Sequence, residues 1–93
     1  MKAIYNGKTI AESNETIVIE GNHYFPPNSI YKEYFEEASL NTTCPWKGLA
    51  SYYDVVVDGK RNKEAAWYYK SPSVLAKSIK DHVAFWRGIE ITE

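Results

Sequence analysis

The sequence lacks most of the features that mark whole classes of protein. It has one cysteine, Cys44, among 93 residues, so no internal disulfide can form, and the chain suits a reducing compartment. Its 11 Lys and Arg residues are balanced by 12 Asp and Glu residues, which gives a net charge of −1. Because nucleic acids and membrane surfaces are usually bound through a basic excess, we expect neither as a partner. There is no apolar run of about 18 residues and no signal-peptide pattern, which predicts a cytoplasmic protein.

Cofactor and metal motifs are missing as well. The chain has no dinucleotide fingerprint and no Walker-type glycine loop. His23, His82 and Cys44 are three side chains that can ligate a metal, but their spacing follows no zinc signature, and a closed structural zinc site needs four ligands. We therefore expect no metal and no cofactor.

Aromatic residues, in contrast, are abundant. Eight Tyr, three Trp and three Phe make up 15% of the chain. A chain of this length removes only about 60% of its unfolded surface from water on folding, and each large ring can bury about 150–250 Å². The sequence therefore predicts a single domain, residues 1–93, in which rings rather than disulfides stabilise the core.

Short β-branched segments separated by turn residues predict a mostly-β domain. Asn6-Gly7 predicts a two-residue hairpin turn, since type I′ turns need positive φ at both positions. We expect the longest strand over Gly48–Val57, with its odd-numbered residues facing the core. A polar connection over residues 58–63 then leads to a strand over Ala65–Tyr69. Further strands are expected at residues 16–20, 83–86 and 89–92.

Two helical segments are predicted beside these strands. Residues fall at helical spacing near 31–38, which predicts a short helical turn there, and residues 39–43 are expected to form a loop. Ser71 as a cap and Pro72 at the first helical position predict an α-helix near residues 72–82. Because closure removes exposed strand edges, we expect a small rolled sheet or partly open barrel, with a β-tent-like arrangement as one form of it.

The stretch from Cys44 to Gly48, Cys-Pro-Trp-Lys-Gly, concentrates the most chemistry. It places a thiol and a primary amine three residues apart, and a nearby ammonium favours the nucleophilic thiolate. Lys47 can also bind a phosphate or carboxylate as a point charge. Cys44 and Lys47 are therefore the candidate catalytic residues. The alternatives are that Cys44 is a small buried side chain and that the stem of Lys47 covers an aromatic ring.

A second aromatic stretch is expected to face this turn. Trp67 and Tyr69 project to one side of their predicted strand, where they can either stack a planar ligand or fill the core. Tyr52 has the same two interpretations, and Glu20 at a strand end is either a structural acceptor or a site carboxylate. The candidate ligand-binding residues are Glu20, Trp46, Lys47, Gly48, Tyr52, Trp67 and Tyr69.

Several short motifs occur together along the whole chain. They are Asn6-Gly7, Glu20 with Tyr24-Phe25-Pro26-Pro27, Thr43-Cys44-Pro45-Trp46-Lys47-Gly48, Ala66-Trp67-Tyr68-Tyr69 with Ser71-Pro72, and Val83-Ala84-Phe85. In this combination the chain resembles the family named domain of unknown function 427. The resemblance implies a compact, mostly-β fold, and the family carries a nucleotidyltransferase-like label. Nucleotidyl transfer uses carboxylates that hold Mg²⁺, and Asp54 and Asp58 are the nearest approach to such a pair.

Three functions follow from these observations, in order of preference. The first is a binding module whose aromatic pocket, around Cys44–Lys47 and Trp67, takes a small anionic or planar metabolite. The second is an enzyme, either nucleotidyltransferase-like or dependent on Cys44. The third is a structural module in which exposed rings form a homodimer face.

Overall fold

The computed structural model describes all residues from Met1 to Glu93. The chain is mostly β, as predicted, with nine strands in three sheets and no closed barrel. No helix has the length and apolar character needed to cross a membrane. The strands are β1 (Lys2–Tyr5), β2 (Lys8–Glu12), β3 (Ile17–Ile19), β4 (Asn22–Tyr24), β5 (Phe35–Cys44), β6 (Gly48–Val57), β7 (Lys60–Tyr68), β8 (Val83–Phe85) and β9 (Glu90–Thr92). The helical segments are 3-10 helices, η1 (Pro27–Ser29), η2 (Lys32–Tyr34) and η3 (Val74–Ile79).

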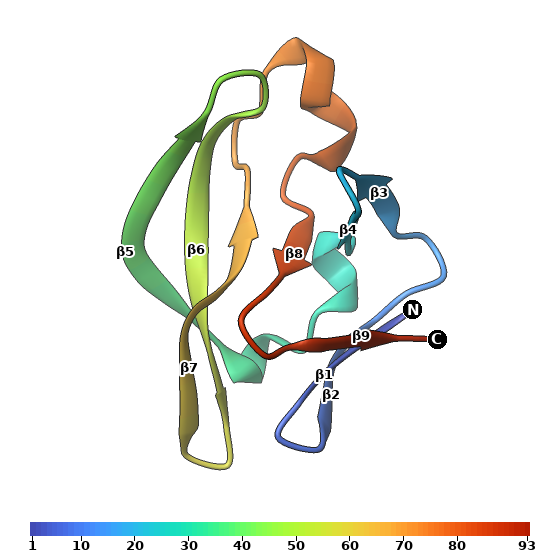
Figure 1. The fold of residues 1–93 in the computed structure, drawn as a ribbon, viewed down its shortest axis with the longest axis vertical. Helices are drawn as coiled ribbons and strands as arrows, with labels where there is room; N and C mark the ends of the chain where they lie inside the picture. Colours follow the sequence, from blue (N-terminus) through green and yellow to red (C-terminus); the bar gives the residue numbers. More distant parts are fainter.

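The two ends of the chain meet in one small sheet with the order β2-β1-β9. β1 and β2 form the predicted hairpin, and Asn6 and Gly7 both have positive φ, 50° and 77°. β9 pairs with the other edge of β1, so the two termini lie side by side (Figure 1). Ala3, Ile10 and Ala11 of this sheet are fully buried, which shows that the sheet covers part of the core.

The largest sheet has the order β5-β6-β7-β8, and every neighbouring pair is antiparallel. The β3–β4 hairpin lies beside it, because two backbone hydrogen bonds of 2.8 Å between Phe25 and Val83 join the end of β4 to β8. Figure 1 shows β5 and β6 as a long, curved pair, with the β5–β6 turn and η3 at the same end of the molecule.

The curvature has a local cause, since both neighbours of β6 are irregular near its centre. Residues 38–40 of β5 lie opposite Tyr52 alone, and residues 63–65 of β7 lie opposite Asp54 alone. Extra residues of this kind bend a strand and increase its twist. Asp54 stabilises the second irregularity, because its carboxylate accepts a hydrogen bond from the Glu64 N–H (2.9 Å).

The core has two parts, one on each face of the largest sheet. The first part packs against the β2-β1-β9 sheet and includes Val55 and Val57 of β6. The second packs against β3, β4 and η3 and includes Tyr52 of β6. Odd-numbered residues of β6 therefore face the core at Val55 and Val57, as predicted, but the prediction is wrong at Leu49, which is exposed. The reason is that β6 passes from one part of the core to the other, and each end is covered on a different face.

The prediction of an α-helix near residues 72–82 is wrong. η3 is a 3-10 helix interrupted by non-helical angles at Ala76 (φ −117°, ψ 19°). Its two buried residues, Ala76 and Ile79, are three positions apart, which suits the three-residue repeat of a 3-10 helix. Ser73, which precedes η3, does not cap it, because its hydroxyl donates to the β5–β6 turn instead.

Two further segments differ from the prediction. The helical turn expected near residues 31–38 is reduced to η2, and β5 occupies the rest of that segment together with the loop expected at 39–43. Pairing with β6 decides the conformation, and the exposed polar side chains of β5 hide it from a pattern based on apolar residues. The polar connection expected over residues 58–63 is the two-residue turn Asp58-Gly59 followed directly by β7.

Candidate functional site

The stretch that concentrates the chemistry forms the turn between β5 and β6. Cys44 ends β5, Gly48 begins β6, and the two are register partners. Gly48 has a φ of +111°, a backbone conformation that residues with a side chain rarely adopt, so glycine is the residue that fits without strain. Ser73 also holds the turn. Its N–H donates to the Lys47 carbonyl (2.9 Å), and its hydroxyl donates to the Trp46 carbonyl. The turn is therefore fastened to the segment that leads into η3.

Lys47 is the unusual residue of this turn, because its side chain is buried. Only 5% of the residue is exposed, and its ammonium forms an ion pair with the Glu20 carboxylate. The ammonium nitrogen lies 5.1 Å from the centre of the Trp46 ring and 5.8 Å from that of Tyr69, within the range of cation–π attraction. One carboxylate and two rings thus surround a buried positive charge.

Glu20 reaches Lys47 from the turn between β3 and β4. It shares that turn with Gly21, and both residues have positive φ, 55° and 79°. Asn, Asp or Gly usually occupies this position of a hairpin turn, because few other side chains tolerate positive φ. The Glu20 side chain is 55% exposed. The turn alone therefore does not explain a glutamate here, whereas the ion pair with Lys47 does.

The charged forms of the pair support each other. The hydrogen bond from Lys47 holds the pKa of Glu20 below its ordinary value of 4.5. Burial by itself lowers the pKa of Lys47, but the bond to Glu20 and three weaker effects together leave that pKa above its ordinary value. The weaker effects on the pKa come from Tyr24, Tyr69 and Cys44. Burial also raises the pKa of Tyr69 to about 12, against the opposing effect of the ammonium. At neutral pH the pair is ionised and the phenol is neutral.

Cys44 lies near the pair without being bonded to it. It is a free, half-buried thiol at the margin of the second part of the core. Cys44 and Lys47 belong to the same turn, and the thiol is the weakest of the groups that raise the pKa of the Lys47 ammonium.

Six aromatic side chains on this side of the sheet contact the pair or one another. The Trp67 indole N–H donates to the Tyr24 hydroxyl (3.2 Å), and the two rings meet edge to face with centroids 6.3 Å apart. The Tyr52 hydroxyl shares a hydrogen bond of 2.9 Å with Thr42 on β5. We call these six residues the aromatic cluster: Tyr24, Trp46, Tyr52, Trp67, Tyr69 and Trp86.

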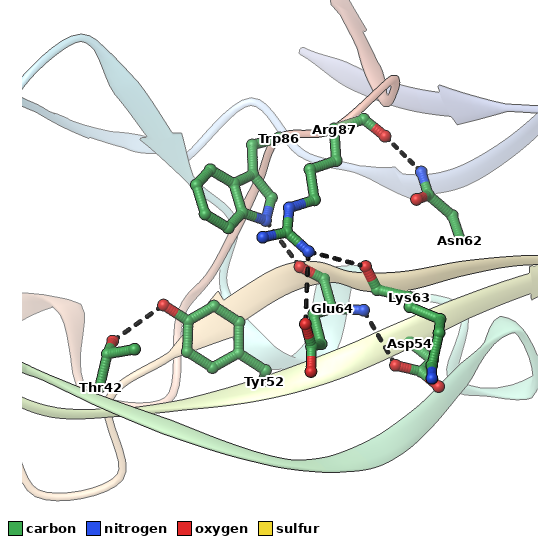
Figure 2. Close-up of polar contacts among 8 residues, drawn as sticks. All are labelled: Thr42, Tyr52, Asp54, Asn62, Lys63, Glu64, Trp86 and Arg87. Carbon is green, nitrogen blue, oxygen red and sulfur yellow. Dashed lines mark hydrogen bonds and ion pairs between the residues drawn. The ribbon is translucent and has the colours of Figure 1, made fainter.

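Trp86, directly after β8, is the exposed end of the aromatic cluster. Its ring meets that of Trp67 edge to face at 5.5 Å and lies 6.4 Å from that of Tyr52. Figure 2 shows how the ring is held: its indole N–H donates to the Glu64 carbonyl (2.6 Å), and the Arg87 guanidinium lies 4.4 Å from the ring centre. The cluster therefore reaches the surface at Trp86, whose ring has these two contacts.

The structure brings the predicted site residues together. Glu20, Trp46 and Lys47 form one contact group, and Tyr52, Trp67 and Tyr69 pack in the same part of the core. Tyr24 and Trp86 were missed. No local pattern could reveal Tyr24, because its partner Trp67 is 43 residues away. Trp86 had a signal in the sequence, since it stands at a strand end before Arg87-Gly88, where a turn leaves a ring near the surface.

No open pocket lies between the predicted site residues. The structure has two surface pockets, of about 330 Å³ and about 240 Å³. The larger lies beside η3, and the smaller lies at Tyr53, Tyr68 and Asp81. The rings of the aromatic cluster pack against one another where a hollow is expected, so a ligand can reach Lys47 only if a side chain moves.

The other candidate groups have structural partners. Both carboxylate oxygens of Asp54 are occupied, one by the Glu64 N–H and the other by the Arg61 guanidinium (2.8 Å), and Asp58 lies in the β6–β7 turn. His23 shares a hydrogen bond with Thr16. No group of three His, Cys, Asp or Glu side chains is arranged to hold a metal ion.

One comparison with known proteins bears on identity. The model of the family described as a domain of unknown function (DUF427) matches residues 1–92. Since the match covers almost the whole chain, the protein belongs to this family. Among curated proteins, no relative matches the sequence.

Proposed function

We propose that this DUF427 protein binds a small molecule that carries an anionic group and a flat ring. Lys47 receives the anionic group, Trp46 and Tyr69 contact the ring, and Gly48 gives the turn its shape. The remaining rings of the aromatic cluster form the floor of the site. We place this binding in the cytoplasm, where a single free cysteine stays reduced.

The observation that carries the proposal is the unequal burial of the Lys47–Glu20 pair. An ammonium removed from water needs a compensating charge, and here the side chain of Glu20 is 55% exposed while that of Lys47 is 7% exposed. Glu20 is attached to a two-residue turn at the surface and not to the core. A carboxylate or phosphate of a ligand can therefore take its place at Lys47 while the core residues stay where they are.

The two rings beside the ammonium indicate what else the ligand carries. Trp46 and Tyr69 already lie at cation–π distance from the nitrogen of Lys47. A flat ring attached to the anionic group can lie against the same surfaces, which is how small-molecule sites commonly combine apolar walls with a few polar groups. An anion without a ring can bind the Lys47 ammonium but leaves the surfaces of Trp46 and Tyr69 without a partner.

Benzoate is a suitable probe, with benzamide as its uncharged counterpart and acetate as the anion without a ring. The chain has three tryptophans, so the indole N–H signals of ¹⁵N-labelled protein give three resolved reporters. We expect benzoate to shift the Trp46 signal most, acetate to bind more weakly, and benzamide to leave the signals unchanged.

Lys47→Met tests whether the ammonium is responsible, and Lys8→Met is the matched control, because Lys8 is an exposed residue of the β1–β2 hairpin. Removing the ammonium is expected to weaken benzoate binding at least tenfold, which corresponds to about 1.4 kcal/mol. Lys8→Met should bind as the wild type does. Equal binding by wild type and Lys47→Met, with both proteins folded, would remove the site assignment.

A second candidate function is thiol chemistry at Cys44, which is favoured by the half-buried free thiol beside the Lys47 ammonium. It predicts that iodoacetamide alkylates Cys44 in the native protein at neutral pH, and that Lys47→Met slows the reaction. Labelling that occurs only after denaturation would exclude Cys44 as a nucleophile.

A further inference from the structure

η3 exposes two aliphatic side chains at one end of the molecule. Val74 and Leu75 are 88% and 81% exposed, the highest values among the large hydrophobic residues. Figure 1 shows η3 at the extremity of the long axis, away from the β2-β1-β9 sheet and the termini. Two adjacent aliphatic residues projecting from an extremity form a small surface that water solvates poorly.

The surrounding contacts hold these two residues outward. The next residue, Ala76, and Ile79 are fully buried. On the other side, Ser73 donates through its N–H to the Lys47 carbonyl (2.9 Å) and accepts from the Ala76 N–H (3.0 Å). Because η3 is fixed before and after Val74 and Leu75, their exposure is a property of the folded chain.

A basic pocket adjoins the same segment. It has a volume of about 330 Å³ and is lined by three lysines, Lys70, Lys77 and Lys80, with Ser71, Pro72 and Val74. None of the three lysines takes part in the four ion pairs of the structure. The neighbouring acid, Asp81, lines the other pocket with Tyr53 and Tyr68. The three lysines therefore form no ion pair within their own chain.

We infer that the η3 end of the molecule docks on an anionic lipid bilayer. Val74 and Leu75 enter the interface between the headgroups, and Lys70, Lys77 and Lys80 hold anionic headgroups at the basic pocket. Surface-bound proteins combine apolar insertion with cationic attraction in this way. A free phosphate or a nucleic acid would explain the lysines and leave the two aliphatic side chains without a partner.

This inference departs from the expectation that composition alone gives. A net charge of −1 argues against a membrane partner only if charge is spread evenly over the surface. Here three lysines gather within one pocket, and the attraction of a charged surface falls off within about a Debye length. The local charge at η3 therefore matters more than the sum over the chain.

Vesicle flotation tests the inference, with vesicles of phosphatidylcholine alone and of phosphatidylcholine mixed with phosphatidylserine. The variants are Val74→Ser with Leu75→Ser, and Lys77→Gln with Lys80→Gln. The matched controls are Val18→Ser, an exposed aliphatic on β3, and Lys8→Gln with Lys63→Gln. All substituted residues are exposed, and an unchanged urea midpoint verifies that each variant is folded.

Wild type and both controls should float with phosphatidylserine vesicles and not with phosphatidylcholine alone. Each lysine near an anionic surface contributes about 1 kcal/mol, or about fivefold in binding. Removing two lysines should therefore lower the partitioning of the protein onto the vesicles about 25-fold. The double serine variant should lower it about tenfold or more, because each buried CH₂ contributes about 0.8 kcal/mol. Absence of wild-type binding would overturn the inference. Undiminished binding by the double serine variant would also overturn it, because charge alone would then hold the protein on the vesicle. Complete displacement of the protein by inorganic phosphate would overturn it too, because it points to a soluble anion.

Discussion

At the scale of residues, the Lys47–Glu20 pair has unequal partners. Lys47 is buried and Glu20 is half-exposed, so removing one differs from removing the other. Glu20→Gln leaves a buried ammonium without its carboxylate, whereas Lys47→Met leaves a carboxylate that water can solvate. We predict that Glu20→Gln lowers the urea midpoint clearly and that Lys47→Met keeps the free energy of unfolding within about 1 kcal/mol of wild type. The reverse order would contradict the burial argument.

Gly48 is a second residue whose identity the structure requires. Its φ of +111° lies beyond the left-handed α region, whereas the Ser71 carbonyl, 3.5 Å from the position of a Cβ atom, is at an ordinary van der Waals distance. Gly48→Ala should destabilise the protein by about 1–3 kcal/mol. The matched change is Gly7→Ala, at a φ of +77° with no atom within 4 Å, for which about 1 kcal/mol is expected. Equal losses in thermal denaturation would contradict the greater backbone strain assigned to Gly48.

At the scale of elements, Asp54 determines the path of β7. Its carboxylate accepts from the Glu64 N–H and from Arg61, and these bonds hold the irregular part of the strand. Asp54→Ala leaves a backbone N–H without its acceptor and should reduce stability by about 1–3 kcal/mol. Glu36→Gln removes only the exposed ion pair with Arg61 and should change stability by at most about 1 kcal/mol. Urea unfolding of the two variants measures the difference.

The elements that could be predicted from the sequence are those with a local sequence signal. Asn6-Gly7 and the apolar residues of β6 carry local signals: the turn lies where it was predicted, and β6 has the predicted bounds. β5 carries no such local signal, because its outward residues are polar and its conformation comes from pairing with β6. η3 was predicted as an α-helix because Ser71-Pro72 resembles a helix start, whereas the chain bonds to the β5–β6 turn through Ser73. Local patterns cannot report contacts of this kind.

The sequence could predict which residues belong to the candidate site, but not how they pack. Trp46, Lys47 and Trp67 could be identified because aromatic and cationic side chains are conspicuous in a short sequence. Their packing without an open pocket could not, since it depends on Tyr24 from another strand. The burial of Lys47 also depends on Glu20, which is 27 residues away.

At the scale of the whole molecule, several of the eight tyrosines should ionise late. Burial raises the pKa of Tyr69 to about 12 and also raises the pKa values of Tyr53 and Tyr68. Each raised pKa adds stability that is fully present below the ordinary value of 10.0 and is lost as pH rises from there toward the folded value. We therefore predict a steep loss of stability above pH 10, with tyrosinate absorbance rising in two phases.

The second of these phases should coincide with the loss of β-sheet circular dichroism. Tyr69→Phe provides the control, because it removes one late-ionising phenol while keeping the ring. Its second phase should be smaller than that of wild type by one tyrosine. Complete ionisation of all tyrosines in a single phase, with the sheet intact, would contradict the burial of these three side chains.

The most direct test of the ligand site is the dissociation constant of benzoate for Glu20→Gln compared with wild type, measured by the shift of the Trp46 indole signal. If a ligand anion replaces the Glu20 carboxylate at Lys47, removing that competing charge must tighten binding, while Lys47→Met weakens it. Tighter binding by Glu20→Gln is the predicted result. Unchanged or weaker binding by a folded Glu20→Gln would mean that the ion pair is structural and that Lys47 is not an anion site.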